Sequence, residues 1–232
     1  MDSLNNSVPS GAAPQPITRL CLVRHGETSW NAERRLQGHQ DIGLNAAGLL
    51  QARAAALSLV GEPVAALYAS DLSRARLTAE AIAAHLGLPP RLLPDFRERC
   101  YGIFEGLTYD EARERHPAEY AAFESRDPDF AFPGGGESLV GFSARVTRQL
   151  AAVAAAHPGQ TVVIVTHGGV LDVVNRFVRG NPLHTPRDFH IPNAGLNWLE
   201  VSGATAQGPW RIALWGCTRH LEGGALDELP GA

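Results

Sequence analysis

TVVIVTHGG, residues 161–169, is the stretch of the chain that decides its fold. Residues 161–165 are all β-branched, which predicts a strand buried on both faces, as the strands of a parallel sheet are. Two glycines follow and lead into a helical pattern over residues 170–178. A buried strand that runs directly into a helix is the building unit of a parallel sheet covered by helices, so the sequence predicts an α/β fold.

The same alternation of short apolar runs and helical patterns continues on both sides of this stretch. Glycines at positions 61, 87 and 180 are expected to end three of the helices. We therefore expect a three-layer α/β/α sandwich with a mostly parallel central sheet. Its further strands are expected at residues 19–23, 64–68, 195–201 and 210–215, and its further helices at residues 46–59, 73–86 and 138–156.

The chain is expected to form one domain over residues 17–222. Residues 1–16 are rich in Ser, Asn, Gly and Pro and are expected to be a flexible N-terminal tail, and residues 223–232 a frayed C-terminal tail. Residues 107–136 form a long, Pro-rich excursion between core elements. Excursions of this length often act as lids over a site.

The composition excludes several classes of function, because all 20 basic residues are arginine. Without lysine there is no Schiff-base chemistry and no P-loop, so oxyanions must be bound by guanidinium groups. A formal net charge of −4 argues against nucleic acid as a partner. No apolar run approaches the ~20 residues that span a membrane. The three scattered cysteines suggest neither a disulfide framework nor a thiolate zinc site, which fits a cytoplasmic protein. No cofactor is expected.

Chemically active side chains follow three of the predicted strands. Arg24 and His25 come after the first strand, Ser70 and Arg74 after the second, and His167 after the strand quoted above. In α/β sheets ligands bind beyond the carboxyl ends of the strands, so these groups are expected to form one oxyanion pocket. Guanidinium groups would neutralise a phosphate, an imidazole could attack phosphorus, and a carboxylic acid would protonate the leaving group.

Four blocks of sequence resemble those of the histidine phosphatase superfamily, also called the phosphoglycerate mutase-like family. The blocks lie in the family's order and cover roughly residues 17–201. They are LVRHGET at residues 22–28, which holds the Arg-His-Gly motif and is followed by Trp30 and Asn31; SDLSRA at 70–75; FRE at 96–98 with YG at 101–102 and EG at 105–106; and VTHGG at 165–169.

The resemblance implies a role for each matching residue. His25 is the expected nucleophile, Arg24, Arg74 and His167 complete the phosphate pocket, and Glu98 takes the acid/base position. Glu105 is its rival, but the spacing to Tyr101 favours Glu98. Six further residues stand at positions where relatives contact phosphate or substrate: Thr28, Asn31, Gln37, Gly38, Tyr101 and Gly168. Of these, Gly168 can offer a backbone N–H. Family members need no metal.

Some of these features also have a purely structural interpretation. Arg24 and Arg74 could instead form structural ion pairs with Glu27 and Asp71. The turn at residues 134–138 is interpreted as a flexible lead into a helix capped by Ser138, with a place beside the pocket as the alternative.

The preferred function is a metal-independent phosphatase that acts on small phosphomonoesters. A phosphoglycerate mutase is the alternative, disfavoured because the excursion lacks adjacent arginines that would grip a substrate carboxylate. A non-catalytic phosphate-binding module is the remote alternative, since every expected catalytic residue is present. The expected partners are a small phosphorylated metabolite or free phosphate and, from the frequency of dimers, a second copy of the chain. Substrate groups beyond the phosphate would be gripped by Arg113, Arg115 or Arg126.

Overall fold

The computed structural model describes residues 16–203, 208–221 and 227. The tails predicted at residues 1–16 and 223–232 therefore lie outside the described residues, apart from Pro16 and Asp227.

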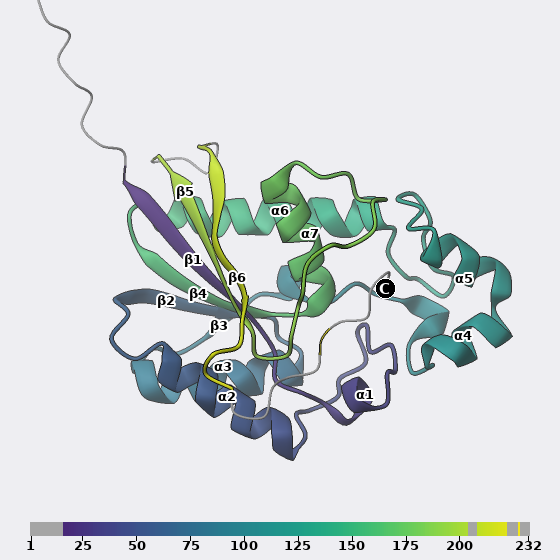
Figure 1. Ribbon diagram of the computed structural model, residues 1–232, viewed down its shortest axis with the longest axis horizontal. Coiled ribbons are helices and arrows are strands. Elements are labelled where there is room, and N and C mark those ends of the chain that lie inside the picture. Colours follow the sequence, from purple (N-terminus) through teal and green to yellow (C-terminus); the bar gives the residue numbers. More distant parts are fainter. Residues whose placement is uncertain (1–15, 204–207, 222–226, 228–232) are drawn as a thin grey trace, which may run out of the picture.

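A six-stranded mixed sheet forms the centre of the molecule (Figure 1). The strands stand in the order β3-β2-β4-β1-β5-β6; neighbours are parallel from β3 to β1, whereas β5 runs antiparallel to both β1 and β6. Their bounds are β1 Ile17–Arg24, β2 Val64–Ala69, β3 Arg91–Leu92, β4 Thr161–Thr166, β5 Leu196–Ser202 and β6 Trp210–Cys217. The predicted sandwich with a mostly parallel sheet is confirmed, and the two-residue strand β3 was missed because so short a segment carries no periodic pattern.

Helices cover both faces of the sheet (Figure 1). On one face lie α2 (Ala46–Ser58) and α3 (Ser73–Leu86), and on the other lie α6 (Leu139–Ala156) and α7 (Gly168–Arg179). Gly87 and Gly180 are left-handed C-caps as predicted. The prediction for Gly61 was wrong, because α2 already ends at Ser58 with Leu59 as its C-cap. Ser138 caps α6 by accepting a hydrogen bond from the Gly141 N–H, as expected.

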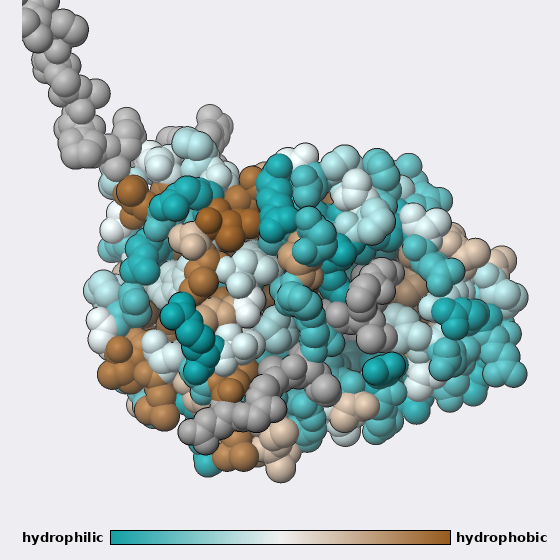
Figure 2. All heavy atoms as spheres, in the orientation of Figure 1, coloured by the Kyte–Doolittle hydropathy of each residue, from teal (hydrophilic) through white to brown (hydrophobic). Residues whose placement is uncertain are grey.

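The excursion at residues 107–136 has structure of its own. After the 3-10 turns η1 (Pro94–Phe96) and η2 (Gly102–Phe104), it forms the short helices α4 (Tyr109–Arg115) and α5 (Pro117–Glu124), which lie to one side of the sheet (Figure 1). Its aromatic residues pack on one another in a separate cluster around Phe104, Tyr120, Phe123 and Phe132. Figure 2 shows mainly hydrophilic residues on the outside of this part of the molecule. The aromatic residues of the excursion therefore largely form the internal core of this part of the molecule.

The strand register brings the first and last motifs of the sequence together. Arg24 pairs with Thr166 at the ends of β1 and β4, and the His25 N–H donates to the Thr166 carbonyl at 2.9 Å. On the other side of β4, the Ser70 N–H donates to the Val165 carbonyl at 3.0 Å. The carboxyl ends of three parallel strands thus place residues from three distant motifs side by side.

Candidate active site

The His25 imidazole stands at the end of β1 with a defined tautomer. Its Nδ1 lies 2.7 Å from the Gly26 carbonyl oxygen, and a carbonyl can only accept a hydrogen bond. Nδ1 must therefore carry the proton and donate it, which leaves the lone pair on Nε2. A neutral imidazole with a lone pair on Nε2 is the form that can attack phosphorus.

His167 lies against His25, with 5.2 Å between the ring centroids. The Nε of Arg74 donates to Nδ1 of His167 at 3.2 Å, so the His167 proton resides on Nε2, which donates to the Ser70 hydroxyl at 2.8 Å. Burial is the largest cause that lowers the pKa of both histidines well below the ordinary 6.5, and the charges of Arg74 and Arg24 lower it further. Both rings are therefore neutral at physiological pH.

The two predicted arginines are buried at the same place and are held by backbone carbonyls. Arg24 Nη1 donates to the Ile191 carbonyl at 2.6 Å, and Arg74 donates to the carbonyls of Gly38 and Gln40 at 2.8 and 2.9 Å. Burial lowers the pKa of Arg74 to about 10, which still leaves it charged near neutral pH. Carbonyl partners hold a guanidinium group in place and leave its positive charge to attract an anion.

Glu27 and Asp71, the alternative ion-pair partners of Arg24 and Arg74, make other contacts. Asp71 pairs with Arg97, whose Nε donates to Oδ1 at 2.7 Å, so the alternative of an Arg74–Asp71 pair is wrong. Glu27 accepts a hydrogen bond from the Asn45 side-chain amide at 2.8 Å.

The hydrogen bonds of Glu98 and Glu105 show which of the two is the better acid/base candidate. The buried Glu98 carboxylate lies beside the start of α7, where its Oε2 accepts from the Gly169 N–H at 2.9 Å and its Oε1 from the Arg99 N–H at 2.8 Å. Glu105 instead accepts from the backbone N–H groups of His39 and Tyr101 and so builds the neighbouring loop. Of the two, Glu98 lines the hollow that contains His25, so the geometry favours it for proton transfer.

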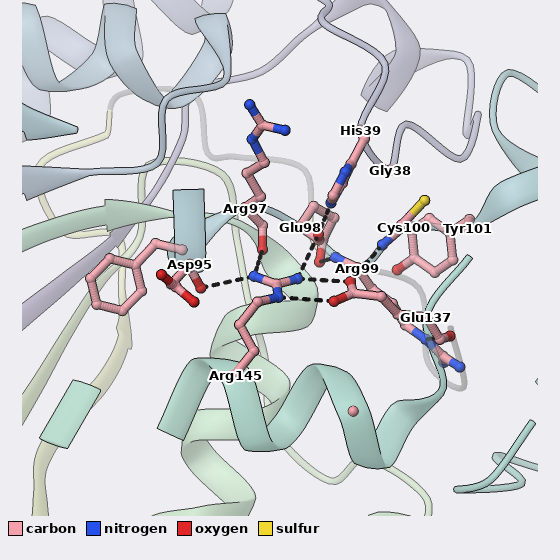
Figure 3. A network of polar contacts seen from close by, with 12 residues as sticks. Gly38, His39, Asp95, Arg97, Glu98, Arg99, Cys100, Tyr101, Glu137 and Arg145 are labelled. Carbon is pink, nitrogen blue, oxygen red and sulfur yellow. Dashed lines mark hydrogen bonds and ion pairs between the residues drawn. The ribbon is translucent and has the colours of Figure 1, made fainter. Parts of the chain in front are cut away.

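Arg145 of α6 fixes the loop that carries Glu98 (Figure 3). Its guanidinium group donates to the backbone carbonyls of Asp95, Arg97 and Glu98 at 2.8, 3.2 and 3.3 Å. It also makes a forked ion pair with Glu137, with N–O distances of 2.9 and 2.7 Å. Glu137 belongs to the turn at residues 134–138, so this turn helps to position the acid/base candidate through Arg145.

A hollow of about 340 Å³ collects most of the predicted site residues. Its walls hold Arg24, His25, Asn31, Gln37, Gly38, Arg74, Glu98 and Tyr101, together with Arg35, Leu36 and Tyr109. Gly38 has a backbone φ of +52°, and a Cβ there would lie 2.1 Å from Oε1 of Glu105. The local turn therefore requires glycine at that position.

Three predicted residues stand behind this hollow and do not form its wall. Thr28 is completely buried and caps α1 (Ser29–Ala32) in a reciprocal capping box with Asn31. His167 has no exposed surface and lies against His25 and Arg74, and Gly168 is the first residue of α7.

Sequence reasoning expected Ser70 in the pocket, where it fixes the tautomer of His167, but it missed three other residues of the site. Gly169 holds Glu98 and stands inside a quoted motif, so its position was the available signal. The Asn193 side-chain amide donates to the His25 carbonyl at 3.0 Å, and Arg35 donates to Glu111 of α4 at 2.9 Å. No motif marks these two positions.

Neither a metal site nor a membrane helix is found in the part of the chain that the structure describes. Among these residues, no group of three or more His, Cys, Asp or Glu side chains could hold a metal ion. No helix within the described ranges is long and apolar enough to cross a membrane.

Comparison with known proteins identifies what this chain is similar to. Residues 20–218 match the model of the histidine phosphatase superfamily (branch 1). A metal-independent phosphoserine phosphatase of Arabidopsis thaliana is 45% identical over 208 residues, covering 88% of this chain and 84% of that protein. A phosphoglycerate mutase-like protein 4 of the same plant is 41% identical over 205 residues, covering 88% and 86%. Among solved structures, a phosphoserine phosphatase of Entamoeba histolytica in complex with 3-phosphoglyceric acid is 27% identical with a TM-score of 0.77, covering 88% of this chain and 100% of that one.

Proposed function

This chain belongs to the histidine phosphatase superfamily, and on that basis we propose that it is a metal-independent phosphoric monoester hydrolase that works through a phosphohistidine on His25. The substrates are small phosphorylated metabolites. The observation that carries the proposal is the hydrogen bond from His25 Nδ1 to the Gly26 carbonyl, because it leaves the Nε2 lone pair in a hollow lined by three guanidinium groups and a carboxyl group.

The first half of the reaction transfers the phosphoryl group to the protein. Arg24 and Arg74 neutralise the phosphate, and His25 Nε2 attacks phosphorus in line with the ester oxygen. The bond from phosphorus to the ester oxygen breaks as the bond from phosphorus to nitrogen forms. The departing alkoxide takes the proton of the Glu98 carboxylic acid and leaves as an alcohol.

The second half hydrolyses the phosphohistidine. Water attacks phosphorus while the Glu98 carboxylate, now ionised, accepts one of its protons. The bond from phosphorus to nitrogen breaks, the electron pair returns to Nε2, and inorganic phosphate is released. His25 is again the neutral tautomer, because the proton has stayed on Nδ1, which donates to the Gly26 carbonyl throughout.

A phosphoglycerate mutase would use the same first half and return the phosphoryl group to a reoriented substrate. We favour the hydrolase because relatives named as phosphatases occur among both the sequences and the solved structures that match. Arg113 and Arg115 of the excursion are exposed and form ion pairs with Asp110 and Glu111. They are therefore not arranged like the pair of arginines that would bind the substrate carboxylate in a mutase.

The test is to incubate the enzyme with a panel of phosphomonoesters that includes 3-phosphoglycerate, measuring free phosphate and isomerisation together. We expect phosphate release, and a phosphoryl adduct on His25 that is labile to acid after rapid quenching. The variant His25→Ala should lose both. Formation of 2-phosphoglycerate with little free phosphate would instead indicate a mutase, and unchanged turnover in His25→Ala would overturn the assigned nucleophile.

Three organisational predictions go with this proposal. We propose that residues 17–222 form a single domain, that the protein acts in the cytoplasm, and that it assembles as a homodimer. Each can be measured directly, by limited proteolysis, by fractionation and by sedimentation.

A further inference from the structure

A second hollow, of about 350 Å³, adjoins the first at Tyr101. Tyr101 lines both hollows, and Gly169, whose N–H holds Glu98, lines the second. In the proposed reaction the phosphate lies in the first hollow, which Glu98 lines together with His25. The second hollow begins at Gly169, the residue that holds Glu98, and is therefore the space next to the acid/base group that is open to the body of the alcohol.

The second hollow carries two guanidinium groups, those of Arg99 and Arg126, which are both buried. Arg99 donates to the backbone carbonyls of Glu137 and Phe130 at 3.0 and 3.1 Å, and its guanidinium carbon lies 4.6 Å from the ring centroid of Phe132. Burial is the largest cause that lowers the pKa of Arg99, and the like charge of Arg126 also lowers it. Within the described residues no carboxylate forms an ion pair with Arg99, so its charge favours an anionic ligand.

Asp172 of α7 is an acidic group in the same wall. Its Oδ2 accepts from Arg126 Nη2 at 2.5 Å and from Arg176 Nε at 3.0 Å. Its Oδ1 is buried and has no hydrogen-bond partner among the described residues. A buried carboxylate oxygen without a donor is costly, so a ligand that brings a donor there is favoured.

The remaining wall is apolar and sets the size of the ligand. Phe123, Leu139 and Phe142 line it, from α5 and α6. Such a surface suits a short hydrocarbon linker and gives no hydrogen bonds to a sugar ring. The hollow thus combines the guanidinium groups of Arg99 and Arg126, the Asp172 carboxylate and an apolar wall, and it includes Gly169, which holds Glu98.

We propose that the second hollow binds a zwitterionic α-amino acid head, so that the preferred substrate is the phosphomonoester of a hydroxyamino acid. The substrate carboxylate binds Arg99 beside Arg126, its ammonium group donates to Asp172 Oδ1, and its methylene group packs on the apolar wall. This inference rests on the proposed function, because it places the alcohol by means of Glu98. A hydroxy acid would satisfy the arginines but would leave Asp172 Oδ1 without a donor.

The experiment compares four substrates on the wild-type enzyme. O-Phosphoserine carries both charged groups, 3-phosphoglycerate has a hydroxyl in place of the ammonium, and O-phosphoethanolamine has no carboxylate. p-Nitrophenyl phosphate reports hydrolysis that needs neither group. We expect kcat/KM for O-phosphoserine to exceed those for 3-phosphoglycerate and O-phosphoethanolamine by about 10- to 100-fold, as for a site built to bind the missing group.

Each outcome of the comparison decides one proposal. Equal values for the first three substrates, or a preference for 3-phosphoglycerate, would overturn the zwitterion site while leaving the phosphatase intact. Failure to hydrolyse all four, p-nitrophenyl phosphate included, would overturn the proposed function itself.

Variants of the hollow test the assignment of the two charged groups. Asp172→Asn keeps the shape of the side chain and should reduce the preference for O-phosphoserine over 3-phosphoglycerate by about tenfold, because an amide is a poorer acceptor for ammonium. Arg99→Gln should instead reduce the preference for O-phosphoserine over O-phosphoethanolamine. The preference is a ratio of two rates, so it does not depend on how much of a variant folds. The control Arg53→Gln changes an exposed arginine of α2 and should leave both preferences unchanged. Unchanged preferences in Asp172→Asn and Arg99→Gln would overturn the proposal.

Discussion

Gly169→Ala should disable the acid/base group while leaving the fold intact. A Cβ at position 169 would lie 2.3 Å from Oε1 of Glu98 and 3.1 Å from its Cδ, whereas ordinary contacts begin at 3.4 Å. The carboxyl group must therefore move by about 1 Å, and a shift of this size costs a catalytic group roughly 100-fold in rate. Position 169 lies in the first turn of α7, where alanine is a better helix former than glycine by about 1 kcal/mol.

The assay is the turnover number on an alkyl phosphate and on p-nitrophenyl phosphate, with thermal unfolding as the measure of stability. We expect kcat on the alkyl phosphate to fall by about 100-fold, because an alkoxide needs a proton from Glu98 to leave. In a single turnover, the loss on p-nitrophenyl phosphate should be smaller, since nitrophenolate departs without one. The control Gly43→Ala adds a methyl group whose nearest neighbour, Leu77 Cδ1, is 3.8 Å away, so it should retain full activity. A Gly169→Ala enzyme that is folded and as active as wild type on the alkyl phosphate would refute the role of Glu98.

Three further predictions concern the supports of the site, its protonation and metal ions. Arg145→Gln removes the forked ion pair with Glu137 and most of the hydrogen bonds to the loop that carries Glu98. We therefore expect kcat to fall by about 10- to 100-fold, with a smaller change in KM. An increase in KM at unchanged kcat would contradict a positioning role. Because the pKa of His25 and of His167 is lowered in the folded state, the unfolded chain binds more protons below the ordinary 6.5. The free energy of unfolding measured in urea should therefore decrease as pH falls below 6.5, by up to about 1.4 kcal/mol per pH unit for each histidine, and a stability that rises on acidification would contradict this. Chelation with EDTA should leave phosphatase activity unchanged, and a loss that zinc restores would point to a metal mechanism.

The sequence specified most of the sheet and its helices because their signals are local. The β-branched run at residues 161–165 needs only its own side chains to favour a buried strand, and α3 was predicted with its bounds as found. The excursion could not be predicted in this way. Helices α4 and α5 are short, and they are held by the aromatic cluster around Phe104, whose members come from distant positions.

The sequence by itself determined which groups are candidates for the chemistry, since the Arg-His-Gly and Thr-His-Gly motifs contain both histidines and the absence of lysine leaves arginine as the cation. Only the tertiary structure decided how these groups are protonated and that a second hollow adjoins them, in which we propose that the substrate's alcohol binds. The tautomer of His167 depends on Ser70 and Arg74, 97 and 93 residues away along the chain. The second hollow depends on Arg99, Arg126 and Asp172, which come from a loop, the excursion and a helix. Their charges interact through space at short range, and the distances exist only once the sheet register and the packing of α5, α6 and α7 are set.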